Sequence, residues 1–355
     1  MAIISGVKFS RKAEVILYLL GYEAEKLSYK VYAVGKFVRD LLLGKESWRI
    51  GLLLEGDVAL YTRCLQRKLS GSIQCYEKLG TASISLPDSF KLEITTLKND
   101  YNFFAGAQSA SPQASLKNEL YKNDFSINTM AIELNPSNFC CLFDYFGGEK
   151  DLAEGTIRVL YSLSFVDEPL RLLRALRLEQ KYGFKIDEET YKLMRSAIAG
   201  KVLHKASKEG IGRELKLILS EPAPWRTLER LQETGLWRHL FPRLPFNKET
   251  IARLQRLERL RDCRLEGKHP LRYNSLVIIL CGLFYGISLH DIHCLIHRLR
   301  LKRDERKYLI ELMEMVMTFP RGPERNKEEA EERLIAFLER QCSREEGVMK
   351  ENVSF

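Results

Sequence analysis

Residues 31–57, VYAVGKFVRDLLLGKESWRIGLLLEGD, constrain the fold more than any other stretch. The segment opens with an apolar run over 31–34, which Gly35 interrupts, and residues 36–43 then place apolar side chains on one helical face. Gly44 ends that helix, and a second apolar run follows. The pattern predicts strand, glycine turn, short helix and strand. A glycine turn before a helix offers backbone N–H groups to a phosphate, although many α/β proteins have this arrangement for packing reasons alone.

Length and composition indicate a globular chain with more than one packing unit. The chain has 355 residues, of which 45% are hydrophobic, enough for two or three cores. It has no apolar run of the length that a membrane span needs, and the segment MAIISGVKFSRK gains charge too early for a secretory signal. We therefore expect a cytoplasmic protein without a membrane partner.

The cysteines and histidines predict no metal centre. The eight cysteines contain no Cys-x-x-Cys pair, which favours reduced thiols over disulfides or zinc. His290, His293, Cys294 and His297 share one helical stripe. A single helix rarely closes a tetrahedral site, so we interpret this stripe as a partly exposed helix face.

Positive charge is concentrated in the second part of the chain. The first 160 residues hold 19 Lys and Arg against 18 Asp and Glu, and the remainder holds 37 against 29. A basic helical region is typical of a protein that binds a polyanion such as RNA, although a solvated helical surface would give the same count.

Along the chain, the pattern predicts an α+β head followed by helices alone. A helix is expected over 9–27 and another over 57–69 with Asp57 as its N-cap, and residues 99–119 are expected to form a loop. Short strands are expected at 72–76, 81–86 and 91–96. Beyond residue 246, helices are expected at 248–262, 273–286, 288–300, 304–318 and 325–341.

The order of residues in the opening stretch resembles the first motif of the class II tRNA nucleotidyltransferases. This family includes the CCA-adding enzymes, their CC-adding and A-adding relatives, and bacterial poly(A) polymerases. Its pattern has two glycines, x, Val-Arg-Asp, a leucine-rich helix and a strand carrying Asp-x-Asp. Gly35, Arg39 and Asp40 match this pattern. The second glycine is replaced by Lys36, and the two metal-binding aspartates fall at Arg49 and Gly51.

This departure predicts that the standard chemistry is lost. Two carboxylates at i and i+2 of a strand point to one face and hold two divalent ions. Arginine places a fixed positive charge at the first position, and glycine supplies no ligand at the second. Glu93 aligns with an acidic position on the family's next strand. It is either a surviving carboxylate or an edge-strand glutamate facing water.

Three further motifs follow, and the resemblance gives them roles in nucleotide binding and in hinge bending. In the second motif, Asp124 and Asn128 are kept, while Lys122 and Asn123 replace an arginine pair. The third motif places Gly147 and Gly148 as a hinge between the catalytic head and a helical neck. The fourth motif presents Asp167, Glu168 and Arg171 to the base of CTP or ATP. A capping acid pair followed by a surface arginine stripe is the structural alternative.

A fifth motif is weaker, because Gly210 replaces its arginine while Glu209 and Glu214 match. Together the motifs imply one set of nucleotide-binding residues. They are Gly35, Lys36, Arg39, Asp40, Lys122, Asp124, Asn128, Asp167, Glu168, Arg171 and Arg174.

The resulting prediction is a nucleotidyltransferase-like head with a small mixed sheet over residues 1–160, followed by helices. The helical part divides into a neck at 161–245, a body at 246–342 and a frayed tail at 343–355. The resemblance implies RNA, in particular tRNA, as a partner, and ATP or CTP as ligands.

Two functions remain open. The first is a catalytically impaired family member that still binds RNA or nucleotide, without a cofactor, and acts as a partner or regulatory subunit of another protein. The second is a working tRNA 3′-end nucleotidyltransferase or poly(A) polymerase that uses Mg²⁺ with other carboxylates. The nearest candidates for that role are Glu55, Asp57 and Glu93.

Overall fold

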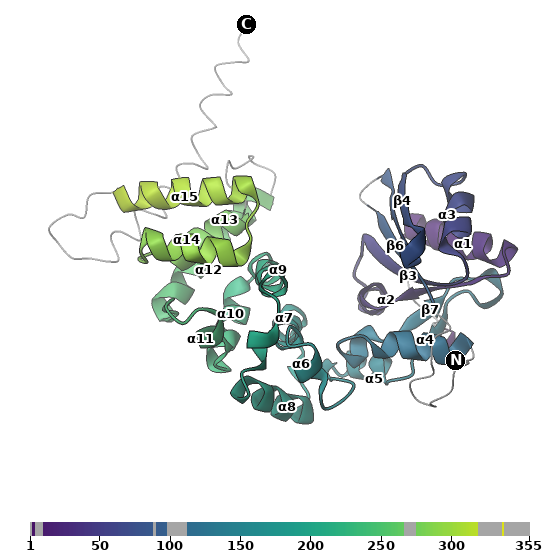
Figure 1. Ribbon diagram of the computed structural model, residues 1–355, viewed down its shortest axis with the longest axis horizontal. Coiled ribbons are helices and arrows are strands. Elements are labelled where there is room, and N and C mark those ends of the chain that lie inside the picture. The colour runs from purple at the N-terminus through teal and green to yellow at the C-terminus, as the bar shows by residue number, and fades with distance from the viewer. Residues whose placement is uncertain are drawn as a thin grey trace, which may run out of the picture. The chain divides into compact units, whose positions relative to one another are not determined.

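The chain divides into two compact units in the computed structural model (Figure 1). The structure describes residues 2–3, 10–87, 90–97, 112–265, 275–318 and 336. Unit 1 comprises Met1–Ser164 and Phe184–Thr190, and unit 2 comprises Phe165–Gly183 and Tyr191–Phe355. No helix among the described residues is long and apolar enough to cross a membrane. The further division of the helical part into neck and body stays a prediction.

Unit 1 is built on a mixed sheet of eight strands in the order β1-β8-β7-β2-β3-β6-β5-β4. Strands β3 and β6 are parallel and the other neighbours antiparallel. The strands are β1 (Ala2–Ile3), β2 (Lys30–Val34), β3 (Arg49–Glu55), β4 (Ser72–Tyr76), β5 (Thr81–Ser85), β6 (Lys91–Thr96), β7 (Ala131–Glu133) and β8 (Cys141–Phe143). This architecture confirms the expected α+β head.

Two helices cover one face of the sheet, α1 (Arg11–Lys26) and α3 (Val58–Gln66), and they lie side by side (Figure 1). The buried Tyr61 hydroxyl of α3 donates to the Leu20 carbonyl of α1 at 2.7 Å. Asp57 is the N-cap of α3, as predicted, because its Oδ1 accepts from the backbone N–H groups of Ala59 and Leu60 at 2.7 and 3.0 Å.

On the opposite face, α4 (Pro112–Tyr121) covers part of the sheet. Leu116 and Leu120 of this helix belong to one apolar cluster with Tyr32, Leu53 and Phe143. The loop expected over 99–119 is therefore wrong from residue 112, because residues 112–121 form a helix and these two leucines pack it against the sheet. Residues 98–111 lie outside the described residues.

The remaining described elements of unit 1 are short. They are α2 (Lys36–Leu42), the 3-10 turns η1 (Glu77–Leu79), η3 (Ser126–Asn128) and η4 (Pro136–Asn138), α5 (Gly148–Ala153), and the parallel pair β9 (Thr156–Ile157) and β10 (Lys185–Ile186).

Where the structure describes it, unit 2 consists of helices and the short 3-10 turn η5 (Val202–Lys205). The helices are α6 (Ser164–Asp167), α7 (Arg171–Tyr182), α8 (Glu188–Ala199), α9 (Lys208–Leu219), α10 (Pro224–Glu233), α11 (Leu236–Leu240), α12 (Lys248–Leu265), α13 (Ser275–Phe284), α14 (Leu289–Leu299) and α15 (Arg303–Thr318). The first residues of α6 and α8 belong to unit 1. Helices α12 to α15 confirm four predicted helices. The helix expected over 325–341 and the tail at 343–355 lie outside the described residues apart from Ala336.

Candidate functional site

The central feature of unit 1 is the register between β3 and β6. Arg49 pairs with Lys91, and Gly51 pairs with Glu93. Side chains alternate along a strand, and the intervening residues Ile50, Leu52, Leu92 and Ile94 are buried. Arg49, Gly51, Lys91 and Glu93 therefore share the other face, and the structure brings together the three positions at which the sequence predicted a lost or surviving metal ligand.

The charges on this face are open to solvent and loosely paired. Arg49 Nε lies 3.8 Å and Lys91 Nζ 3.6 Å from Glu93 Oε1. The three side chains are 66%, 39% and 48% exposed, in the order Arg49, Lys91, Glu93. Two cations thus flank one carboxylate. Among the described residues there is no group of three or more His, Cys, Asp or Glu side chains placed to hold a metal.

The two other candidate carboxylates are engaged elsewhere. Glu55 accepts a hydrogen bond from the Tyr32 hydroxyl at 3.0 Å, and burial raises the pKa of Glu55. It stands four residues beyond Gly51 on the strand, about 13 Å at the usual rise per residue. Asp57 follows it and caps α3. Neither shares the register position of Glu93.

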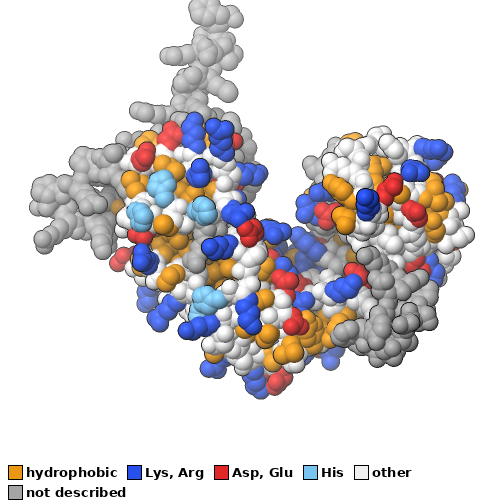
Figure 2. Space-filling view, in the orientation of Figure 1, with side chains coloured by type: hydrophobic (Ala, Val, Ile, Leu, Met, Phe, Trp, Pro, Cys, Tyr) orange, Lys and Arg blue, Asp and Glu red, His pale blue; other side chains and the backbone are white. Residues whose placement is uncertain are grey.

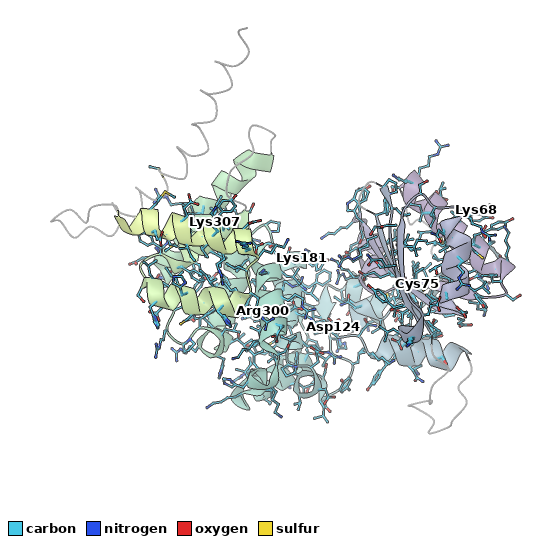
Figure 3. The ribbon with its side chains drawn as sticks, turned by 45° about the horizontal axis from the view of Figure 1, so that its top comes forward. Lys68, Cys75, Asp124, Lys181, Arg300 and Lys307 are labelled. Carbon is cyan, nitrogen blue, oxygen red and sulfur yellow. The ribbon has the colours of Figure 1, made fainter. Side chains whose placement is uncertain are left out.

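Four of the predicted nucleotide-binding residues form one hydrogen-bonded network. Arg39 Nε and Nη2 donate to Asp40 Oδ1 at 3.0 and 2.7 Å, and Arg39 Nη1 donates to Asn128 Oδ1 at 2.8 Å. Asn128 Nδ2 in turn donates to Asp124 Oδ1 at 2.7 Å. Arg39, Asp40 and Asn128 are buried. The network ties α2 to η3, so these side chains hold the framework of the site (Figure 3 labels Asp124).

The remaining phosphate-contact candidates of unit 1 also make contacts within the protein. Gly35 has a φ of 69°, which glycine adopts readily, and its N–H donates to the Met130 carbonyl at 3.1 Å. Lys36 is the exposed first residue of α2. Lys122 pairs with Glu119, and Asn123 Nδ2 donates to the Leu120 carbonyl at the end of α4 at 3.0 Å.

A second polar network was missed by sequence reasoning. Asp151 accepts from Ser126 Oγ at 2.5 Å and from Arg158 Nε at 3.1 Å, and Arg158 Nη1 donates to Asp187 at 2.7 Å. The hydrogen-bonded partners lie up to 29 residues apart in the chain, so no local spacing predicts their pairing.

The predicted hinge glycines lie inside unit 1. Asp144 accepts from the backbone N–H groups of Gly148 and Glu149 at 2.9 and 3.0 Å. Gly147 has a φ of 73°. A Cβ at Gly148 would lie 2.3 Å from the Ser126 carbonyl oxygen, so that position requires glycine for close packing. The hinge role of both residues stays a prediction.

In unit 2, the arginine stripe of α7 lies against α9. Arg171 is buried, and Arg174 Nε donates to Glu214 at 2.7 Å and lies 3.9 Å from Glu168. The ion pairs continue along the helix: Arg177 pairs with Glu214 and Glu221, and Lys181 pairs with Glu221. These arginines are therefore not the solvated surface stripe of the structural alternative. Asp167 is the last residue of α6 and is exposed.

The glycine that replaces the fifth motif's arginine lies in α9. The Gly210 N–H donates to the Ser207 hydroxyl at 3.1 Å, which caps the helix. A Cβ at Gly210 would lie 2.5 Å from Leu170 Cδ1. Helix α9 runs through Gly210 and Gly212 without interruption.

Unit 2 also contains a cavity of about 310 Å³ between the start of α9, residues 241–244 and α14. Its lining combines the apolar side chains of Phe241, Leu244 and Leu295 with His297 and with the charged side chains of Lys208, Arg243, Asp291 and Arg300. Histidines and basic side chains gather on one face of this unit in Figure 2. Arg300, labelled in Figure 3, pairs with Glu209 of α9, and its carbonyl accepts from Lys216 Nζ at 2.7 Å.

Comparison with known proteins gives two family matches. Residues 31–158 match the family model described as "Poly A polymerase head domain", and residues 183–247 match "Probable RNA and SrmB-binding site of polymerase A". The chain is 38% identical over 250 residues to the A-adding tRNA nucleotidyltransferase of Geobacter sulfurreducens, which covers 70% of the chain and 28% of the relative. It is 32% identical over 245 residues to the A-adding enzyme of Halalkalibacterium halodurans, covering 68% and 57%. The chain thus spans less than two thirds of these curated relatives.

Solved structures extend the likeness to the helical part. The Thermotoga maritima CCA-adding enzyme complexed with tRNA is 29% identical with a TM-score of 0.70, covering 97% of this chain and 82% of that one. A tRNA nucleotidyltransferase complexed with a primer tRNA and an incoming ATP analogue is 25% identical with a TM-score of 0.75, covering 94% and 98%.

A mixed-sheet head with this parallel β3–β6 pair, followed by helices, defines a protein of the nucleotidyltransferase class. The sequence motifs and the family matches identify a particular family within this class. The chain belongs to the class II tRNA nucleotidyltransferase and poly(A) polymerase family, as the sequence predicted.

Proposed function

We propose that this chain binds RNA, in particular tRNA, and that its nucleotidyl transfer is impaired or lost. The observation that carries the proposal is the register of β3 and β6. It places Arg49 and Gly51 beside Glu93, where the family's motif has carboxylates.

The donor set of this face does not suit a divalent cation. Mg²⁺ requires near-octahedral coordination by oxygen atoms and is usually held by one or two carboxylates together with the substrate's phosphates. Here one carboxylate lies between an ammonium and a guanidinium, and both cations would repel the ion. Two-metal nucleotidyl transfer needs a pair of carboxylates on one strand, and among the described residues of this face Glu93 is the single carboxylate beside Arg49, Gly51 and Lys91.

The second candidate function is a working tRNA 3′-end nucleotidyltransferase or poly(A) polymerase with non-standard carboxylates. It would require Glu55 or Asp57 to act together with Glu93. Glu55 accepts from Tyr32, Asp57 caps α3, and both lie beyond the strand positions that pair with β6. These contacts favour the first function.

Binding of RNA and nucleotide is supported by what the chain retains. The Arg39 network keeps the second motif in place, and the cavity of unit 2 combines cations with an apolar lining. A CCA-adding enzyme similar to this chain is solved with tRNA, and others with ATP and CTP. A chain that binds RNA without extending it would act as a partner or regulatory subunit of another protein.

The decisive experiment is incorporation of labelled CMP and AMP into a tRNA that lacks its 3′ end, with magnesium and multiple turnover. We expect no incorporation. The variants Glu93→Ala and Asp57→Ala serve as controls: turnover by the natural chain that either substitution abolishes would establish the second function.

RNA binding is tested separately by its salt dependence. We expect residues beyond 160 to carry most of it, each phosphate contact contributing about 0.7 to 0.9 to the slope of log affinity against log salt. Lys208→Gln with Arg243→Gln, at the unit 2 cavity, should reduce the slope. The matched pair Arg63→Gln with Lys68→Gln, in unit 1, should leave the slope unchanged, and the reverse result would contradict the assignment.

A further inference from the structure

The face of β3 and β6 that carries Glu93 also carries two cations, Arg49 and Lys91. We propose that Arg49 and Lys91 form a binding site for a polyphosphate, such as the triphosphate of ATP or CTP, that operates without a divalent cation. The proposal rests on the proposed loss of metal-dependent transfer. It assigns to this face direct, metal-free binding of a polyphosphate, which a pair of carboxylates would repel.

The two cations have donors to spare. Among the described residues, neither the Arg49 guanidinium nor the Lys91 ammonium donates a hydrogen bond, because their distances of 3.8 and 3.6 Å to Glu93 exceed hydrogen-bonding range. Exposed ion pairs of this kind contribute little, so a phosphate loses little by displacing Glu93. A guanidinium fork matches the oxygens of a phosphate in two parallel hydrogen bonds, and an ammonium adds a point charge.

The neighbouring strand positions keep this face polar and open. Ser85 pairs with Lys91, and Ser83 pairs with Glu93, so their hydroxyls lie on the same face. Gly51 adds no side chain, and even a Cβ there would have its nearest neighbours, atoms of Val34, at 3.7 Å. The glycine leaves room beside the cations, and the two serine hydroxyls are neutral donors for further phosphate oxygens.

The sign of the Glu93 effect separates this site from a metal site. In a metal site the carboxylate is a ligand, so its loss weakens binding. In a site built on cations the same carboxylate competes with the phosphate for Arg49 and Lys91, so its neutralisation strengthens binding. Excess Mg²⁺ acts in the same direction as Glu93, because it neutralises the polyphosphate before it reaches the protein.

The test is isothermal titration of the full chain with inorganic tripolyphosphate, ATP and CTP in EDTA. We expect all three to bind, Arg49→Gln and Lys91→Gln each to weaken binding about tenfold, and Glu93→Gln to strengthen it. Arg63→Gln, which removes an exposed cation from α3, should leave affinity unchanged. Equal affinities for tripolyphosphate and ATP would assign recognition to the phosphates, and tighter binding of ATP or CTP would add a contact to the nucleoside.

Binding that requires Mg²⁺, binding that Glu93→Gln abolishes, or affinity that survives Arg49→Gln would each overturn the site. The incorporation assay on the same samples keeps the two proposals apart. Turnover of the natural chain overturns the proposed loss of transfer. Absence of both turnover and binding in EDTA overturns the polyphosphate site alone.

Discussion

Two arginines of unit 1, ten residues apart, lie in opposite environments. Arg39 is 2% exposed and donates hydrogen bonds to Asp40 and Asn128, whereas Arg49 is exposed and makes one loose ion pair with Glu93. A buried, hydrogen-bonded ion pair leaves an uncompensated charge when one member is removed, and an exposed pair does not. The fold thus depends on Arg39, while the charge at position 49 can change without cost to the fold.

The largest expected effect on stability comes from replacing the buried arginine, Arg39. Arg39→Met should lower the free energy of unfolding by about 3–5 kcal/mol, since it leaves the Asp40 carboxylate buried without that partner. Arg49→Met should lower it by less than about 1 kcal/mol. Denaturant unfolding followed by circular dichroism measures both variants. Similar losses in the two variants would show that burial does not distinguish the arginines.

Two glycine substitutions test the same contrast between a buried and an open position, here through packing alone. Gly148→Ala places a Cβ 2.3 Å from the Ser126 carbonyl oxygen and should cost about 1–3 kcal/mol of stability. Gly51→Ala meets nothing closer than 3.7 Å and should change stability by less than about 0.5 kcal/mol. Thermal unfolding of the two variants under one buffer condition measures the difference. A Gly148→Ala variant as stable as the natural chain would show that this corner can shift.

Local patterns predicted the elements of the fold better than they predicted its contacts. Apolar alternation located β4 and β6 at their observed limits, and the N-cap position of Asp57 follows from its own neighbours. Helix α4 was missed because its polar residues outnumber Leu116 and Leu120, whose burial depends on the distant strands β2 and β8. Burial through tertiary packing is not visible within a short sequence window.

The candidate site shows the same limit. The motifs selected Arg39, Asp124 and Asn128 as ligand-binding residues, but Arg39 and Asn128 are separated by 89 residues and their mutual hydrogen bond could not be read from the chain. The positions of Arg49 and Gly51 came from the motif. Their neighbour Lys91 was not selected, because its role arises only from the parallel register of β3 and β6.

Restoring the carboxylates tests whether the exposed face has been correctly aligned. Arg49→Asp with Gly51→Asp would place two carboxylates beside Glu93, and the backbone at Gly51 has room for a side chain. We expect a measurable gain in affinity for Mg²⁺ or Mn²⁺ by isothermal titration, little change in stability, and little turnover. Turnover stays low because Lys36, Asn123 and Gly210 still differ from the family pattern, and each lost charged contact costs roughly 1.5–3 kcal/mol in the transition state.

Adding Lys36→Gly, Asn123→Arg and Gly210→Arg to that double variant should raise turnover further, provided that Leu170 moves away from the new side chain at position 210. The incorporation assay compares the natural chain, the double variant and the quintuple variant. If the double variant gains no metal affinity over the natural chain, Arg49 and Gly51 do not occupy the metal positions.

The smallest expected effect concerns an exposed ion pair of unit 2, Glu209 with Arg300. The pKa of Glu209 lies below its ordinary value of 4.5, first because of a hydrogen bond from its own backbone N–H and then because of the Arg300 charge. A depressed pKa means that the carboxylate's contribution to stability is present above pH 4.5 and is lost as the pH falls through the folded-state pKa. Because the backbone hydrogen bond is the larger cause of the shift, Arg300→Gln should raise the pKa of Glu209 only part of the way to 4.5. Lys307→Gln on α15 should leave this pKa unchanged. Titration of the Glu209 side chain by NMR measures both variants. A full return to 4.5 in Arg300→Gln would assign the pKa shift to the ion pair instead of the backbone hydrogen bond at the helix N-terminus. An exposed ion pair of this protein would then perturb its carboxylate strongly, which the contrast between Arg39 and Arg49 assigns to buried pairs.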